Sequence, residues 1–312
     1  MVTIAFTSDL HVDASEANAA LLPHLVEAVE ASEPDLFLLA GDVGGGATGL
    51  LGTLEAFRPL PVPKLFVPGN HDLWMEARGP FTRYRLDSAT KYHALLPALC
   101  ESAGWHYLPA EPFKLNGVGL AGAMGWYDYS LRNRALDGLI PRRAYLQGRF
   151  GRLVWNDARR IRWPKRPGEP GWRRRSACLT DKAILDRQLA SLEGHLSRLE
   201  AEGASAVVVV THFLPGAELL DYTGQPELDF ACGFAGSRRL GGLIASRPAV
   251  QALICGHTHR PGQATSEGVP VYQSPVGLLA RCCARLPFLK AGRPSPLKVL
   301  AKERVGILKI EA

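Results

Sequence analysis

The chain has 312 residues, of which 46% are hydrophobic and 21% are charged, as is usual for a globular protein rather than a disordered or fibrous one. This length can bury a substantial core, and no apolar stretch approaches the roughly 20 residues that a membrane-spanning helix needs. The net charge of +6 is uneven, because 14 Lys and Arg residues stand against three acidic residues between Arg132 and Arg175. The remainder of the chain is therefore net negative.

The N-terminus lacks the features of a secretory signal peptide. Its first residues are not basic, and its apolar run is too short for a signal sequence because a polar motif begins by Asp9. Six cysteines are present without any Cys-x-x-Cys spacing, which favours reduced thiols. These patterns predict a cytoplasmic protein without a transmembrane segment, and they leave its oligomeric state open.

Apolar runs and a helical segment alternate in the first part of the chain. Val2–Thr7 predicts a strand, and Ser15–Ser32 predicts a helix because its leucines and valines recur near 3.6-residue spacing. Asp35–Ala40 and Pro63–Val67 are continuous apolar runs, which is typical of strands buried on both faces. Asn116-Gly117 lies between two short apolar runs and predicts a β-hairpin turn.

The second half of the chain resumes this alternation. Leucines at alternating spacings of four and three predict an amphipathic helix over Thr180–Glu202. Ala206–Val210 and Val250–Cys255 predict buried strands, and Val269–Gln273 and Val305–Ile310 predict closing strands. Alternating strands and helices indicate an α/β fold whose ligand site lies beyond the carboxyl ends of the strands.

Residues 124 to about 179 interrupt the pattern. They are rich in Arg, Trp, Tyr, Pro and Gly and show little periodicity. We therefore expect one domain over residues 1–312 that carries a partly irregular basic insertion, or cap, at about 124–179.

Five short polar motifs each follow an apolar run. Leaving Asp72 aside, they supply two carboxylates, one amide and five imidazoles, which nearly complete a site for two adjacent divalent cations and one catalytic imidazole. The motifs are Asp9-Leu10-His11, Gly41-Asp42, Gly69-Asn70-His71-Asp72, Thr211-His212 and Gly256-His257-Thr258-His259.

The spacing within two motifs supports shared ligation. Side chains at positions i and i+2 of an extended segment face the same way, so Asp9 and His11 can hold one ion together. His257 and His259 can likewise contribute to one cluster. Mixed carboxylate, amide and imidazole ligands suit Mn²⁺, Fe²⁺ or Zn²⁺. We expect Mn²⁺, with Fe, Zn or Ni as alternatives.

The five motifs together resemble those of the calcineurin-like metallophosphoesterases, and they extend from Asp9 to His259. The family fold is a four-layer αββα sandwich of two packed mixed sheets flanked by helices, with which the predicted strands and helices are compatible. Protein Ser/Thr phosphatases of this superfamily continue the Gly-Asp motif with Asp-Arg-Gly, whereas here Val43 follows Asp42. The chain therefore resembles the bacterial phosphodiesterase and phosphatase branch more closely.

The resemblance implies a role for each motif residue. Seven ligands would hold two ions that share the Asp42 carboxylate. The first ion would be held by Asp9, His11, Asp42 and His259, and the second by Asp42, Asn70, His212 and His257.

The catalytic roles that the resemblance implies fall on His71 and Asp72. His71 would protonate the departing alkoxide, and Asp72 would orient His71 or support its loop. A hydroxide that bridges two ions about 3.5–4 Å apart is a strong nucleophile at neutral pH. Proton delivery to the leaving group contributes about 10²–10⁴-fold to the rate. The implied activity is hydrolysis of a phosphoester of a small molecule or nucleotide. A phosphodiesterase is favoured over a phosphomonoesterase.

The insertion allows further interpretations. Trp126, Tyr127 and Tyr129 follow a predicted strand and, with Asn70, could line the substrate mouth. The arginines suit phosphate groups and the aromatic rings suit bases, so one alternative is a nuclease that binds DNA or RNA through the cap. A solvated, composition-biased insertion without function is equally compatible. A second alternative is a non-catalytic scaffold, although all seven proposed ligands and His71 are present.

Overall fold

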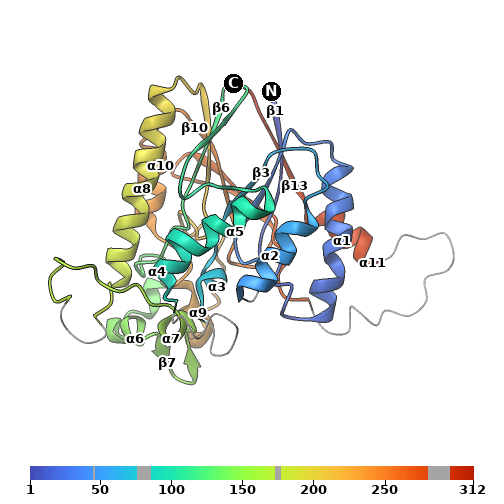
Figure 1. The fold of residues 1–312 in the computed structure, drawn as a ribbon. Helices are drawn as coiled ribbons and strands as arrows, with labels where there is room; N and C mark the ends of the chain where they lie inside the picture. Colours follow the sequence, from blue (N-terminus) through green and yellow to red (C-terminus); the bar gives the residue numbers. More distant parts are fainter. Residues whose placement is uncertain (45, 76–85, 173–176, 280–295) are drawn as a thin grey trace.

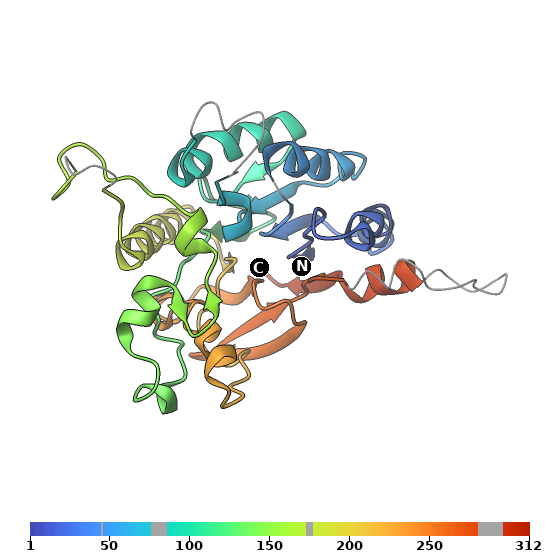
Figure 2. The ribbon, with the colours of Figure 1, turned by 90° about the horizontal axis from the view of Figure 1, so that it is seen from below.

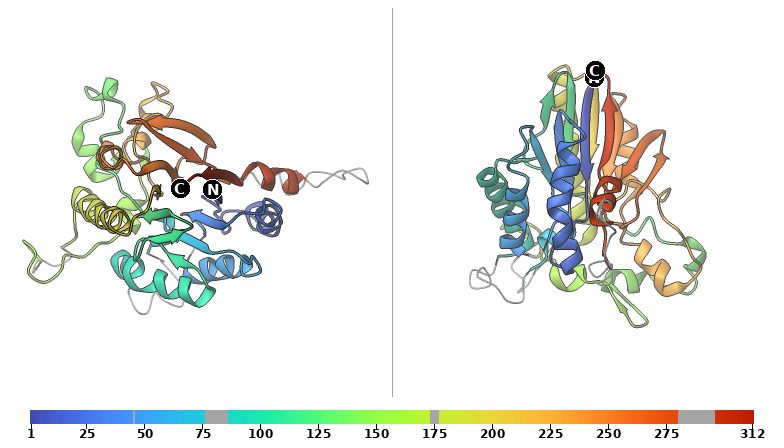
Figure 3. Two further views of the ribbon diagram at one scale, coloured as in Figure 1. Left: turned by 90° about the horizontal axis from the view of Figure 1, so that it is seen from above. Right: turned by 90° about the vertical axis from the view of Figure 1, so that its right-hand side faces the viewer.

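The computed structural model describes the chain except for residues 45, 76–85, 173–176 and 280–295. In the described part, two large mixed sheets pack face to face, and helices cover their outer faces (Figure 1 and Figure 3). This arrangement is the four-layer αββα sandwich that the resemblance implied, so the predicted fold class is confirmed. The predicted strands recur within one residue of their expected bounds.

The first sheet has parallel central strands and an antiparallel edge strand. Its strands are β1 (Val2–Thr7), β2 (Leu36–Ala40), β3 (Lys64–Val67), β4 (His106–Tyr107) and β13 (Gly306–Ile310). They lie in the order β13-β1-β2-β3-β4, and only the β13–β1 pair is antiparallel. The carboxyl ends of β1, β2 and β3 therefore meet at one edge.

The second sheet repeats this design. Its strands are β5 (Phe113–Leu115), β6 (Val118–Gly122), β9 (Ala206–Val210), β10 (Val250–Cys255), β11 (Gly262–Ser266) and β12 (Val269–Gln273). Their order is β11-β12-β10-β9-β6-β5, with antiparallel pairs only at the two edges. The predicted Asn116-Gly117 hairpin joins β5 to β6, and φ is 47° at Asn116 and 85° at Gly117, as a two-residue turn of this type requires.

Helices bury the outer face of each sheet. The first sheet is covered by α1 (Glu16–Glu30), α2 (Gly46–Ala56) and α5 (Leu96–Ala103), and α11 (Pro296–Glu303) packs beside α1. The second is covered by α8 (Asp181–Ala201) and α10 (Arg238–Ala245). The predicted helix over Thr180–Glu202 is thus confirmed as α8, whose N-cap hydroxyl on Thr180 accepts from the backbone N–H of Ala183.

One apolar core lies between the two sheets. Side chains such as Ile4 and Leu38 of the first sheet and Val208 and Ile254 of the second are fully buried there. Because central strands such as β2 and β9 are covered on both faces, their sequences are continuous apolar runs rather than alternating ones. The core holds the strand ends of the two sheets at fixed positions next to one another.

The insertion is more regular than its sequence indicates. It contains η3 (Arg134–Leu136), α6 (Arg142–Gln147), the antiparallel pair β7 (Arg149–Phe150) and β8 (Leu153–Val154), and α7 (Asp157–Arg160). Together with α9 (Pro226–Cys232), it lies at the end of the molecule opposite both termini (Figure 1 and Figure 2). Three arginines of the basic block, Arg173–Arg175, lie outside the described residues.

Short helices lie between β3 and α5 in the chain. They are α3 (Asn70–Leu73), α4 (Ser88–Thr90) and η2 (Lys91–Leu95). Within the described ranges, no helix combines the length and apolar character that crossing a membrane requires. The cysteines that the structure describes, Cys100, Cys178, Cys232 and Cys255, are free thiols, and Cys282 and Cys283 fall outside the described residues.

Candidate metal centre

The motif residues come together at the carboxyl ends of five parallel strands. Asp9 and His11 follow β1, Asp42 follows β2 and Asn70 follows β3, all neighbours in the first sheet. Other motif residues follow β9 and β10, which are neighbours in the second sheet; they are His212, His257 and His259. Since the two sheets pack face to face, these strand ends converge from both.

The backbone of this region is unusual. Left-handed conformations occur at five of the motif residues, where non-glycine residues seldom adopt them. The φ angles are 53° at Asp9, 44° at His11, 56° at Asp42, 76° at His257 and 57° at His259. Such conformations cost free energy, so their concentration in one cluster is a mark of a functional site. They turn successive side chains away from the strand direction and toward one another.

Close approach of two loops also requires glycine. Gly41 has φ of 86°, and a Cβ atom there would lie 2.6 Å from His212 Nδ1 and 2.5 Å from Gly69 N. Any larger residue would push the β2 and β3 loops apart. The glycine before Asp42 is therefore needed to bring that carboxylate beside the imidazole.

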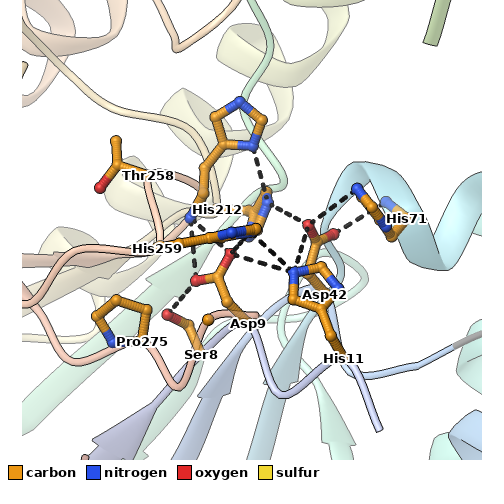
Figure 4. Close-up of polar contacts among 12 residues, drawn as sticks. Ser8, Asp9, His11, Asp42, His71, His212, Thr258, His259 and Pro275 are labelled. Carbon is orange, nitrogen blue, oxygen red and sulfur yellow. Dashed lines mark hydrogen bonds and ion pairs between the residues drawn. The ribbon is translucent and has the colours of Figure 1, made fainter. Parts of the chain in front are cut away.

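The ligand-type atoms form two groups that share Asp42. Within each group the donor atoms all lie within 4.8 Å of one another. His11 Nε2 is 2.9 Å from His259 Nε2 in the first group, and His257 Nδ1 is 3.2 Å from His212 Nε2 in the second. Figure 4 shows the rings of His11, His212 and His259 gathered beside the carboxylates of Asp9 and Asp42. The groups are Asp9, His11, Asp42 and His259, and Asp42, His212 and His257.

Asp42 is the electrostatic centre of the cluster. Its Oδ2 lies 3.3 Å from His212 Nε2 and 3.8 Å from the Nε2 atoms of His11 and His71 (Figure 4). Burial opposes ionisation of this carboxyl, but the surrounding imidazoles prevail and hold its pKa well below the ordinary value. Burial alone would lower the pKa of His212, yet Asp42 raises it above its ordinary value. A metal ion that replaced the proton on His212 would therefore meet an ionised carboxylate.

Asn70, the neutral donor expected for the second ion, borders the same cavity as Asp42 and His257. Its Nδ2 donates to Asp157 Oδ1 at 2.9 Å, and this partner fixes the amide orientation because an ionised carboxylate only accepts. The Asn70 Oδ1 atom is buried and finds no hydrogen-bond partner among the described residues. A buried unpartnered oxygen is costly unless a ligand satisfies it. This oxygen, together with the converging imidazole nitrogens, fits two divalent cations.

Asp72 and His71 occupy different surroundings. Asp72 accepts from the backbone N–H groups of Asp42 at 2.9 Å, Val43 at 3.0 Å and Gly69 at 2.8 Å. Of the two roles expected for Asp72, these contacts favour support of the loop. The His71 side chain is 32% exposed and stacks on Trp74 with ring centroids 3.5 Å apart. Its backbone N–H donates to Asp42 Oδ1 at 2.9 Å, which places the ring at the edge of the cluster.

The aromatic run after β6 does not line the mouth of the site, so that expectation is wrong. Trp126, Tyr127 and Tyr129 are buried in the core. Trp126 Nε1 donates to Asp181 Oδ1 at 2.9 Å, and the Tyr129 hydroxyl donates to Asp181 Oδ2, which ties both rings to the start of α8. Gly125, where φ is 78°, precedes this run, and the rings of Trp126 and Tyr127 pack against Phe213.

Other residues of the insertion line the site instead. A cavity of about 290 Å³ borders Asp42, Asn70, His71, His257 and His259. Its remaining walls come mainly from the loop after α3 and from the segment that follows β7; they are Trp74, Leu153, Val154, Trp155, Asn156, Asp157 and Leu278.

Asp157, which belongs to none of the five motifs, connects the cap to the cluster through Asn70. Its carboxylate accepts from Trp74 Nε1 at 2.6 Å and from Trp155 Nε1 at 3.0 Å in addition to Asn70. Burial raises its pKa to about 6, although these three donors act in the opposite direction. One signal was present in the sequence: Asp157 is one of only three acidic residues in the basic block.

Comparisons with solved structures find proteins of similar fold. A phosphopantetheinyl hydrolase from Mycobacterium tuberculosis has a similar fold, with a TM-score of 0.65, 21% identity, and coverage of 92% of this chain and 93% of that one. A dimetal phosphatase from Danio rerio has a TM-score of 0.50, 15% identity, and coverage of 89% and 88%. No curated protein matches the chain. Residues 2–261 match the calcineurin-like phosphoesterase family, and the chain belongs to that family.

Proposed function

We propose that the chain is a phosphodiesterase that uses two divalent cations, with Mn²⁺ as the preferred metal. The observation that carries this proposal is the pair of donor groups that share Asp42 at the strand ends. The proposed ligands are Asp9, His11, Asp42, Asn70, His212, His257 and His259. We also infer that residues 1–312 form one domain, because the cap's Asp157 bonds directly to Asn70. The cytoplasmic location remains a prediction from the cysteine pattern.

Bound cations of this kind supply a water of lowered pKa as nucleophile and neutralise the phosphoryl oxygens. His71 is the proposed general acid, because its ring borders the cavity without belonging to either donor group. Burial lowers the pKa of His71, while Asp42 opposes this shift. An anionic phosphoester beside the ring favours the protonated imidazole that donates to the leaving oxygen. Asp72 holds the loop that carries His71.

A metal analysis followed by a substrate panel tests this function. The purified protein is expected to hold about two metal equivalents and to hydrolyse aryl phosphodiesters faster than aryl phosphomonoesters when Mn²⁺ is added. Cyclic nucleotides and single-stranded nucleic acid complete the panel. A phosphopantetheinyl ester belongs in it too, since the structural neighbour from Mycobacterium tuberculosis is named for that group. Metal binding without turnover of any ester would favour the non-catalytic scaffold.

Replacing Asp157 by asparagine should weaken the metal group to which Asn70 contributes. The new amide keeps the volume but accepts through one oxygen only, so the three donors around it can no longer all be satisfied. Losing a group that orients a metal ligand typically costs about 10- to 100-fold in metal affinity. Titration of the metal-free protein with Mn²⁺ by calorimetry measures this effect.

The matched control for Asp157 is another acid of the basic block. Asp137 pairs with Arg132 and is exposed, so Asp137→Asn should leave both metal affinities unchanged. If Asp157→Asn bound two equivalents of Mn²⁺ as tightly as the native protein, Asp157 would have no part in orienting Asn70.

The exposed arginines of the cap support a second candidate, a nuclease. Arg142, Arg143, Arg149, Arg152 and Arg159 are exposed, and no ion pair to them occurs among the residues that the structure describes. They belong to α6, the β7–β8 pair and α7, which lie at the same end of the molecule as the strand ends that carry the metal ligands (Figure 1). The phosphate backbone of a nucleic acid would therefore meet positive charge close to the metal centre.

The nuclease candidate predicts salt-dependent binding of a single-stranded oligonucleotide. The logarithm of the binding constant should fall with the logarithm of salt concentration, with a slope of about −0.7 for each phosphate contacted. The double variant Arg149→Glu/Arg152→Glu should reduce both the affinity and the slope, measured by fluorescence anisotropy. Arg58→Glu, outside the insertion, is the control. Lack of binding at low salt would eliminate this candidate.

A further inference from the structure

Two cavities of similar size adjoin the metal centre. The first is the cavity that His71 borders, and its volume is about 290 Å³. The second has the same volume and lies between α9 and the segments around Leu219 and Arg260. Trp155 and His257 line both cavities, so the boundary between them falls at a proposed metal ligand. A phosphorus atom held at His257 would have room for an organic group on either side.

The position of His71 distinguishes the two sides. His71 borders the first cavity and not the second. A proton donor must lie within hydrogen-bond reach of the oxygen that departs. The departing group therefore belongs in the first cavity, and the group that stays on phosphorus belongs in the second.

The first cavity suits an uncharged, flat group. Its described lining includes the carboxylates of Asp42 and Asp157 but no Lys or Arg, so it disfavours a second anionic group. The indole of Trp155 stacks on Phe234, with centroids 4.7 Å apart and planes 15° apart, and its Nε1 is held by Asp157. A fixed aromatic wall of this kind stabilises a flat ring packed against it.

The second cavity also suits an uncharged group. Its floor comes from α9 and the following turn, where Leu228, Ala231 and Ala235 present apolar surface. The one cation in its described lining, Arg260, already forms an ion pair with Asp221 at the exposed rim. Neither cavity therefore offers an unpaired Lys or Arg in its described lining to pair with a further negative charge on the substrate.

We propose that the natural substrate is a phosphodiester with two uncharged organic groups, the departing one in the first cavity and the retained one in the second. This proposal rests on the phosphodiesterase function proposed above. Water forms the new P–O bond, the bond to the departing oxygen breaks, and that oxygen takes a proton from His71. One water proton passes to solvent, and the products are an alcohol and a phosphomonoester of the retained group.

Two diesters with a common leaving group test the second cavity. Phenyl p-nitrophenyl phosphate and methyl p-nitrophenyl phosphate both release p-nitrophenolate, so they differ in the retained group. Ala231→Phe places a ring into the second cavity and should lower kcat/KM for the phenyl diester by about tenfold or more, as obstruction of an apolar pocket typically does. The methyl diester should be nearly unaffected. Val154→Phe, in the first cavity, should slow both diesters equally.

Binding to the metal-free protein gives a readout that does not depend on turnover. Diphenyl phosphate carries a ring for each cavity, whereas dimethyl phosphate carries no ring. Calorimetry should show that Ala231→Phe weakens diphenyl phosphate binding and leaves dimethyl phosphate binding unchanged. Ala135→Phe, an exposed position that lines neither cavity, is the control and should change neither.

The outcomes separate this proposal from the function on which it rests. Turnover of no phosphoester by the Mn²⁺-loaded protein would refute the phosphodiesterase function. Faster hydrolysis of p-nitrophenyl phosphate than of either diester would also refute that function. Equal effects of Ala231→Phe on the phenyl and methyl diesters would overturn the two-cavity assignment alone. If Ala231→Phe fails to fold, Leu228→Trp decides the same question, because Leu228 is 53% exposed and tolerates a larger ring.

Discussion

Replacing Asp42 by alanine is expected to remove metal from both donor groups and to abolish turnover. Asp42 is the member that the two groups share, and its Oδ2 lies 3.3 Å from His212 Nε2. Loss of groups that only orient a ligand costs about 10- to 100-fold, so loss of a shared ligand should cost more than about 100-fold in activity. Elemental analysis and the rate on an aryl phosphodiester with added Mn²⁺ measure the two effects.

The Asp42 experiment needs a control for folding, because the carboxylate also accepts from the His71 backbone N–H and neutralises His212. Asp42→Asn keeps the hydrogen-bond acceptor but removes the charge, and it should lose metal as the alanine variant does. Circular dichroism melting curves show whether either variant remains folded. A folded Asp42→Ala protein with native activity would refute the bridging role.

Replacing His71 by alanine should leave the metal content unchanged. It should reduce turnover most for esters whose leaving group must be protonated as it departs. His71 lies 3.8 Å from Asp42 through its Nε2 and belongs to neither donor group. An alkyl phosphodiester has a poor leaving group, so its hydrolysis should slow by about 10²–10⁴-fold. A p-nitrophenyl diester releases p-nitrophenolate, which is stable as an anion, so its hydrolysis should slow much less. Steady-state rates on the two esters provide the comparison.

The His71 comparison is informative because the two esters share one active site. Equal losses on both esters would mean that His71 acts on binding or on the metals rather than on the leaving oxygen. His106→Ala, on the edge strand β4, is a control at an ordinary histidine and should not discriminate between the esters.

The α/β class was predictable from the sequence because the central strands of both sheets are buried on both faces, whereas the four-layer arrangement was implied by the resemblance to the family. Apolar runs such as Val2–Thr7 and Ala206–Val210 have no alternation, and that pattern persists in the structure. The proposed ligands were identifiable for a related reason. Each occurs directly after such a run, and parallel strands deliver their carboxyl ends to one edge.

The cap was not predictable in the same way. Trp126 and Trp155 both lie in an irregular, basic segment. Trp126 is buried against α8, whereas Trp155 lines the cavity. Their different positions depend on long-range partners, Asp181 and Asp157, that local periodicity does not reveal. The role of Asp157 depends on Asn70, 87 residues away in the chain, and only the folded structure brings them together.

The left-handed backbone at Asp9, His11, Asp42, His257 and His259 limits how this centre could be transferred to another scaffold. Grafting these side chains onto regular strand ends would aim them in other directions, because their convergence is set by the turns that carry them. A designer would have to transplant the turns together with the residues, including the glycines that allow adjacent loops to touch.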